Sequence, residues 1–169
     1  WLAARYEASQ AQSNVERDVA DAMSDIRSAL TRDVQTLQAL QAGQPSAQQW
    51  RPEPDQLLRA NRAWVRIEWR GPRMDIVAEA DTPYRPPVFG RFGRANAQAE
   101  VQQACINARR ISSHAYARSH FVPQRDGLGL EVMELCVPQV IAGQLTGFLV
   151  ATYSLDELLA SHIYPQLGR

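Results

Sequence analysis

Four polar side chains at alternate positions of residues 113–122 have the types and spacing needed to bind a small molecule. They are His114, Tyr116, Arg118 and His120. Since successive side chains of a β-strand point to opposite faces, this spacing predicts that the four share one face of a strand. The guanidinium group of Arg118 is suited to a small anion, because it can bind a carboxylate through two parallel hydrogen bonds.

Residues 81–94, DTPYRPPVFGRFGR, are expected to form an irregular loop over this strand, because three Pro and two Gly disfavour regular structure. A loop of this length is usually functional or disordered, and the aromatic content argues against disorder. Its charged and aromatic side chains are Arg85, Arg91, Arg94, Tyr84, Phe89 and Phe92. If the polar face of the strand is turned away from the longest helix, the side chains of both segments converge on one site.

The expected ligand-binding residues come from the loop, from this strand and from the strand that follows. They are Tyr84, Arg91, Arg94, Tyr116, Arg118, His120 and Glu134. The alternative is that the alternating residues form only the solvated face of a half-buried strand. A metal site at His114, His120 and Glu134 is not favoured, because the spacing is weak and no dense Cys/His cluster supports it. No cofactor is expected.

Sequence patterns of catalysis are missing, so binding without turnover is expected and the domain is not predicted to be an enzyme. There is no Walker-type loop and no HExxH motif, and Ser112-Ser113-His114 lacks the pattern of a nucleophile elbow. The net charge is zero, so electrostatics give no reason to expect binding to nucleic acid. The sequence has no signal peptide and no apolar run of membrane length, so an excised domain is expected.

Residues 1–42 are expected to form one long helix. Its apolar stripe is Val15, Val19, Met23, Ile26, Leu30, Val34, Leu37 and Leu40. These spacings of three or four are typical of an amphipathic helix. At ~1.5 Å per residue the helix would be roughly 60 Å long, so part of it must project or pair with a partner helix. The alternative is a core helix that ends sooner.

The rest of the chain predicts a five-stranded antiparallel sheet with segregated helices, an α+β fold. The expected strands are 64–69, 74–80, 113–122, 130–140 and 145–153, and a helix is expected over 95–110. Ala142 and Gly143 mark a hairpin turn between the last two strands. Ser154 and Glu157 predict the capping box of a C-terminal helix. We expect a single domain, with the helix in 1–44 and the sheet in 45–163.

Cys105 and Cys136 permit one disulfide, with one cysteine on an expected helix and the other on an expected strand. A disulfide requires Cα atoms within about 7 Å of each other. Because two separately buried thiols are the commoner outcome, we expect free thiols rather than a bond.

The order of these elements resembles the extracytoplasmic PAS-like sensor domains called PDC or Cache domains. The residues that carry the resemblance are Ala115-Tyr116-Ala117, the strand Glu131–Val137, and Gly147-Phe148-Leu149-Val150-Ala151-Thr152-Tyr153-Ser154-Leu155 with Leu158-Leu159. The resemblance implies a long N-terminal helix lying across the sheet, and an insertion between the second and third strands that closes over a ligand pocket.

The likeness to periplasmic sensor domains of bacterial histidine kinases implies a ligand-sensing input domain. Such a domain would bind a small molecule, with a carboxylate suggested by the arginines, and would be tethered to the inner membrane. A homodimer through the N-terminal helix is expected, and a chemoreceptor or a diguanylate cyclase could carry the same input. The aspartate with which amino-acid-binding members grip an ammonium group is not found, so an amino acid is not favoured. The alternative is a ligand-free dimerisation module, with the space under the loop filled by Phe89, Phe92 and Tyr116.

Overall fold

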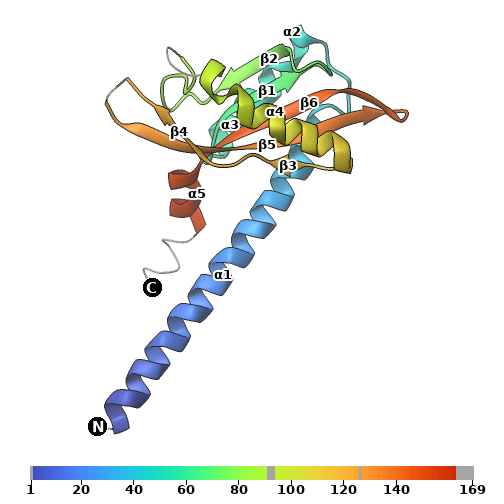
Figure 1. Ribbon diagram of the computed structural model, residues 1–169. Coiled ribbons are helices and arrows are strands. Elements are labelled where there is room, and N and C mark those ends of the chain that lie inside the picture. The colour runs from blue at the N-terminus through green and yellow to red at the C-terminus, as the bar shows by residue number, and fades with distance from the viewer. Residues whose placement is uncertain (1, 91–93, 126, 163–169) are drawn as a thin grey trace.

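The longest element, helix α1 (Leu2–Leu40), extends from one face of an antiparallel sheet in a computed structural model that describes residues 2–90, 94–125 and 127–162 (Figure 1). With 39 residues, α1 is about 60 Å long. Its C-terminal part packs on the sheet, whereas Val15, Val19 and Met23 are 44–55% exposed. The single long helix is therefore confirmed, and the alternative of a shorter core helix is wrong.

The sheet contains six strands in the order β2-β1-β6-β5-β3, with β4 also pairing with β5. Their bounds are β1 Trp64–Arg70, β2 Ile76–Asp81, β3 Ala115–Tyr116, β4 His120–Pro123, β5 Gly129–Ile141 and β6 Gln144–Ser154. The five strand pairings in the described part of the chain are all antiparallel, which confirms the α+β fold. The expected strand 113–122 is two short strands, because the chain leaves the ladder at residues 117–119.

The β5–β6 hairpin forms as expected. Ala142 and Gly143 have φ values of 52° and 79°, as a two-residue turn with both central residues in the left-handed region requires. At the other end of β6, the Glu157 amide donates to Ser154 Oγ at 3.4 Å and begins helix α5 (Leu155–His162). A full capping box would also have the Glu157 side chain accept from the Ser154 amide. That amide donates instead to the Ala63 carbonyl at 2.8 Å, so this half of the expected capping box is replaced by a contact with the start of β1.

One face of the sheet packs against α1, the short helices α2 (Ala47–Trp50) and α3 (Pro52–Ala60), and α5. The buried side chains of this α1-side core include Val34, Leu37, Leu40, Trp50, Leu58, Trp64, Ile67, Leu135, Val137, Leu149, Ala151, Tyr153 and Leu158. α5 contacts α1, and both leave the sheet on the same side (Figure 1). No helix in the described residues is both long and apolar enough to cross a membrane.

The other face is covered by the loop 82–90 and by helix α4 (Arg94–Ile111). Small side chains on α4, Ala104 and Ala108, pack against β5 and let the two backbones approach closely. Cys105 and Cys136 consequently lie with their Cα atoms 5.4 Å apart and form a disulfide. The expectation of two free thiols was wrong, because helix and strand are closer here than their sequence separation could indicate.

Candidate functional site

Three charged residues alternate along β1 and point to the face of the sheet turned away from α1. Arg66, Glu68 and Arg70 are only 6%, 0% and 0% exposed, whereas the intervening Ile67 belongs to the α1-side core. Period-two alternation on a strand produces this separation. Burying charges is very unfavourable unless they are paired, so the partners of these three residues define a site.

Glu68 is the centre of an ion-pair network. Its Oε2 accepts from Arg66 Nε at 2.7 Å, and its Oε1 accepts from Arg70 Nε at 2.9 Å and from Arg94 Nη2 at 2.7 Å. Arg94 is the first residue of α4, and its Nη2 also donates to Glu134 Oε2 on β5 at 3.0 Å. Side chains from β1, β5 and α4 therefore meet in one buried place.

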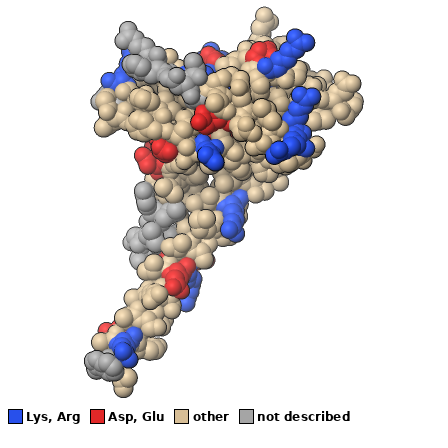
Figure 2. Space-filling view, viewed as in Figure 1, with Lys and Arg blue, Asp and Glu red and all other residues tan. Residues whose placement is uncertain are grey.

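The rim of the site neutralises its remaining positive charge. Arg66 Nη1 donates to both carboxylate oxygens of Asp81 at 3.1 Å, and Arg66 Nη2 pairs with Glu79. Arg70 Nη1 donates to the carbonyl of Met74 at 3.0 Å. On the surface shown in Figure 2, acidic and basic side chains are likewise interspersed, with no large field of one sign.

The two buried carboxyl groups have opposite pKa shifts. Burial favours the neutral form of Glu68, but the guanidinium groups of Arg94, Arg70 and Arg66 outweigh it and lower the pKa of Glu68 to about 2. Burial raises the pKa of Glu134 above its ordinary value, against the opposing effect of Arg94. The difference follows from the number of cations, because Glu134 accepts a hydrogen bond from Arg94 alone among the described residues, whereas Glu68 accepts from three guanidinium groups.

Several buried polar atoms at this place have no hydrogen-bond partner. They are Arg94 Nε and Nη1, Glu134 Oε1, His120 Nε2 and Thr152 Oγ1. His120 Nε2 lies 3.6 Å from Glu134 Oε1, too far for a hydrogen bond. We use "charged cluster" for the set Arg66, Glu68, Arg70, Arg94, His120, Glu134 and Thr152. Because buried polar atoms are normally satisfied, the cluster is suited to a molecule that supplies both an acceptor and a donor.

The loop 82–90 closes over the charged cluster and is fixed by apolar packing. Phe89 is 7% exposed, and Arg94 Cζ lies 4.3 Å from the centroid of its ring, a cation–π contact. Val88 and Phe89 pack against buried side chains of three strands. These are Val65, Val122, Leu130 and Val132. The loop is therefore an ordered cover, as its aromatic content predicted.

Three of the expected ligand-binding residues, Arg94, His120 and Glu134, are brought together in the charged cluster. Tyr84 is not, because its hydroxyl donates to the Arg59 carbonyl on α3 at 2.8 Å. Arg118 is exposed and lines a groove along α4. Arg91 lies outside the described residues, as does Phe92.

Tyr116 lies on the opposite face of the sheet. It pairs with Leu135 and packs against the α1-side core, while His120 contacts Glu134 on the other side. The prediction that Tyr116, Arg118 and His120 share one face was wrong. The strand is interrupted after Tyr116, where the Ala117 amide donates to the Glu134 carbonyl at 2.8 Å, so the period of two does not continue to His120.

Sequence reasoning missed Arg66, Glu68, Arg70 and Thr152. The signal was present in the segment WVRIEWR, where charged residues alternate with apolar ones on a strand with apolar neighbours. An alternating strand is usually half solvated, so only the tertiary structure shows that both faces of β1 are buried. Among the described His, Cys, Asp and Glu side chains, no group of three or more is arranged to hold a metal ion.

Comparison with known proteins gives a likeness of fold. No family model matches the sequence, and no curated protein matches it. The structure is similar to the ligand-binding domain of the Pseudomonas aeruginosa PAO1 amino acid chemoreceptor PctC in complex with GABA, with 19% identity and a TM-score of 0.54 over 86% of this chain and 61% of that chain. The ligand-binding domain of Mlp24 with asparagine matches with 13% identity and a TM-score of 0.37 over 88% of this chain and 63% of that one.

The chain thus spans about three fifths of the length of these two domains. At 19% identity the likeness to PctC shows a shared fold, a long helix with an antiparallel sheet. The same fold hosts many functions, so function must be inferred from the site.

Proposed function

We propose that this chain is the periplasmic ligand-sensing input domain of a bacterial receptor of the inner membrane, with the charged cluster as its recognition site. The observation that carries the proposal is the group of buried, unpartnered polar atoms on the face of the sheet turned away from α1. Leaving such atoms unsatisfied is unfavourable, so a molecule that pairs with them gains affinity. The fold shared with the PctC ligand-binding domain supports the proposal, as does a disulfide of the kind that persists in the periplasm.

The proposed ligand is a small carboxylate that also carries a hydrogen-bond donor. Arg94 supplies two N–H groups without acceptors, Nε and Nη1, which would bind a carboxylate through charge-assisted hydrogen bonds. Glu134 Oε1 and Thr152 Oγ1 would accept from a hydroxyl, amide or ammonium group. Binding without turnover is the role of the site.

The charged cluster has a direct structural connection to both helices that leave the sheet. Glu134 pairs with Thr152 on β6, and β6 continues into α5. The next residue, Tyr153, contacts Asp33 on α1. A ligand that draws Arg94 and Glu134 together would therefore bias the position of α1 relative to α5. Differential binding of a few kcal/mol is enough to shift such an equilibrium.

We further propose that the whole protein is a sensor histidine kinase that dimerises through α1. The stripe formed by Val15, Val19 and Met23 is exposed at spacings of four residues, and pairing with the same stripe of a second copy would bury it. In this arrangement α1 continues from a transmembrane helix and α5 returns the chain towards the membrane. A chemoreceptor or a cyclase output would use the same input.

A thermal-shift screen followed by calorimetry tests ligand binding. The panel contains acetate, succinate and malate, together with 4-aminobutyrate and asparagine, which the two neighbouring receptors bind. At least one compound should raise the melting temperature, because a molecule that binds only the native state stabilises it. Carboxylates with a second polar group should bind more tightly than acetate.

Two variants assign that binding to the charged cluster. Arg94→Met should abolish it, and Thr152→Val, which removes a hydroxyl without a partner, should weaken it while the fold is retained. Arg118→Met is the matched control, because this arginine is exposed outside the cluster. Equal loss of affinity in the Arg118 variant, or no loss in the Thr152 variant, would contradict the assignment.

The second candidate is a ligand-free dimerisation module, which the exposed stripe on α1 favours. Its expected packing beneath the loop is met by Phe89, whereas Tyr116 lies on the other face. Analytical ultracentrifugation of the wild type and Val19→Asp tests self-association. A dimer lost in the variant, combined with no response to any compound of the panel, would favour this candidate.

A further inference from the structure

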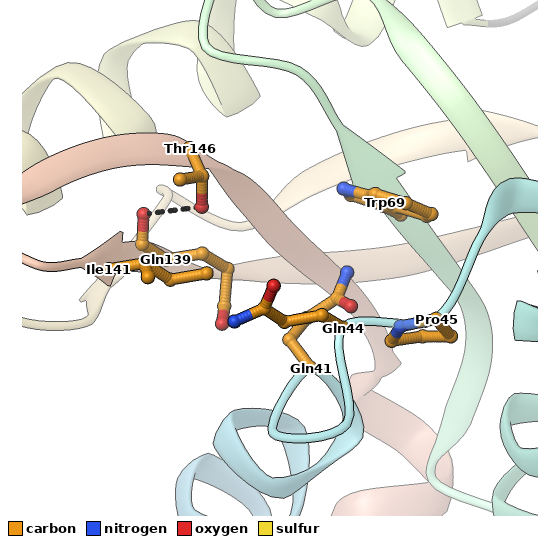
Figure 3. Close-up of a pocket in the computed structure, with 7 residues that line it drawn as sticks. All are labelled: Gln41, Gln44, Pro45, Trp69, Gln139, Ile141 and Thr146. Atoms are coloured by element: carbon orange, nitrogen blue, oxygen red, sulfur yellow. Dashed lines mark hydrogen bonds between the residues drawn. The ribbon is translucent and has the colours of Figure 1, made fainter.

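A pocket lies on the α1 side of the sheet, between the C-terminal end of α1 and the β5–β6 hairpin. Its volume is about 230 Å³. We call it the amide pocket, and it is lined by Gln41, Gln44, Pro45, Trp69, Gln139, Ile141 and Thr146. In Figure 3 the side chains of Gln44 and Gln139 extend toward each other, and Gln41 and the ring of Trp69 lie beside them.

The amide pocket is distinct from the charged cluster. Trp69 lies between Glu68 and Arg70 on β1, so its side chain points to the opposite face of the sheet. Glu68 and Arg70 are buried in the ion-pair network, whereas Trp69 packs against the α1-side core and contacts Trp50, with ring centroids 6.3 Å apart. The two sites therefore lie back to back across one strand.

Two side-chain amide nitrogens of residues that line the pocket are buried without acceptors. Gln41 is only 9% exposed, and its Nε2 has no acceptor. Nε2 of Gln139, on β5, is also buried without an acceptor. By contrast, Thr146 Oγ1 donates to the Gln139 carbonyl at 3.1 Å (Figure 3). Donors on two separate elements that line the pocket are thus unsatisfied, and a bound molecule with acceptors that reaches them would satisfy both.

The lining determines the kind of molecule that fits. None of the described side chains that line the amide pocket is ionisable, so a charged ligand would find no counter-charge. Three primary amides offer both donors and acceptors, and the indole of Trp69 offers a flat apolar wall. The volume is below the ~300–1,000 Å³ of pockets for drug-sized ligands, so the occupant is small.

We propose that the amide pocket binds a neutral, hydroxyl-rich molecule of about monosaccharide size. One apolar face of the sugar ring lies on Trp69, and hydroxyl oxygens accept from Gln41 and Gln139. Gln41 directly follows α1, so the bound sugar ties the end of that helix to β5. This gives the domain a second input that acts on the same helix and does not depend on the charged cluster.

Calorimetry and saturation-transfer NMR with D-glucose, D-galactose and D-ribose test the proposal on the wild-type chain. At least one sugar should bind, and Gln41→Met and Gln139→Met should each weaken it at least tenfold. Met keeps the unbranched shape of Gln but removes the amide. Gln144→Met is the matched control on the same hairpin, since Gln144 is exposed and does not line the pocket. It should bind the sugar as the wild type does.

The melting temperatures of the variants without sugar show whether a loss of binding reflects a folding defect. Gln41→Met should melt at the same temperature as the wild type or higher, because it removes a buried donor without a partner. Binding of simple amides such as acetamide with no response to any sugar would overturn the assignment. So would equal sugar affinity in the wild type and Gln41→Met, or no response to any of the three sugars.

Discussion

Tyr153 and Asp33 join the last strand of the sheet to the projecting helix: the Tyr153 hydroxyl donates to Asp33 Oδ2 at 2.6 Å. Tyr153 is fully buried, and burial raises the pKa of its hydroxyl, which therefore stays protonated as the donor. Asn61 Nδ2 donates to the other oxygen of Asp33 at 3.5 Å. This contact holds α1 at a fixed position on β6, one residue from the charged cluster member Thr152.

Replacing Tyr153 by Phe should therefore loosen the attachment of α1. The substitution leaves a half-buried carboxylate oxygen without its donor, which costs about 1–3 kcal/mol in the free energy of unfolding. Urea denaturation measures the loss, and hydrogen exchange should show faster exchange of the α1 amides around Asp33. Tyr6→Phe is the control, because Tyr6 is 71% exposed on the same helix and should change stability by less than about 0.5 kcal/mol. An unchanged exchange rate in Tyr153→Phe would contradict the proposed coupling.

The fold was predictable from the sequence because its elements are specified locally. The stripe of α1 has helical spacing, and Ala142-Gly143 fits only a few hairpin turns, so both were found from short-range patterns. Features that depend on distant segments were not found. The Cys105–Cys136 disulfide and the burial of Glu68 arise where α4 and the loop cover the sheet.

The candidate site was predictable in part for the same reason. Arg94, His120 and Glu134 were identified from residue type, and the structure brings them together. Tyr116 was placed on the wrong face because the prediction extended one strand period across residues 117–119, where the ladder is interrupted. No local pattern in the sequence marks that interruption.

The stability of the domain should fall in acid because of Glu68. Its folded-state pKa of about 2 lies below the ordinary 4.5, so its contribution is fully present above pH 4.5 and is lost as the pH falls towards 2. The loss amounts to about 3 kcal/mol at ~1.36 kcal/mol per pKa unit. Burial raises the pKa values of Glu134 and Asp33, so their contributions change in the opposite sense, weakening as the pH rises through the folded values.

Denaturation curves between pH 2 and pH 6 measure this dependence. In Glu68→Gln the free energy of unfolding should fall less between pH 4.5 and pH 2. The variant should also lose about 3–5 kcal/mol at neutral pH, because the arginine partners of Glu68 lose their counter-charge. Glu53→Gln is the control, since Glu53 is exposed in the first turn of α3, outside the network. If Glu68→Gln does not fold, carbon-13 NMR titration of the wild-type carboxyl groups measures the folded-state pKa of Glu68 directly. A glutamate titrating near 4.5 at this position would contradict the network.

The disulfide should contribute substantially to stability. It closes a loop with a sequence separation of 31 residues, for which chain entropy predicts about 3–4 kcal/mol. The double variant Cys105→Ala, Cys136→Ala should lower the free energy of unfolding by that order, and reduction of the wild type should do the same. Alkylation followed by mass spectrometry should find no free thiol before reduction. Full labelling of both cysteines in the unreduced protein would show that the bond does not form.

Gly147 is required because another strand passes close to its Cα atom. A Cβ atom there would lie 2.3 Å from the carbonyl oxygen of Arg70, and backbone cannot yield as a flexible side chain does. Gly147→Ala should therefore push β6 away from the end of β1 and destabilise the domain by about 1–3 kcal/mol. The displacement moves Arg70, so affinity at the charged cluster should fall as well.

Thermal denaturation and calorimetry compare this variant with Gly43→Ala, where no atom lies within 4 Å of the added Cβ. The control should be neutral or slightly stabilising, since Ala reduces the freedom of the unfolded chain. Because Gly147 pairs with Gln139, the shift in Gly147→Ala also disturbs the amide pocket. One added methyl group should therefore weaken binding at both the charged cluster and the amide pocket, because the two sites lie on opposite faces of the same strands. Unchanged stability in Gly147→Ala would contradict the close approach of β1 and β6.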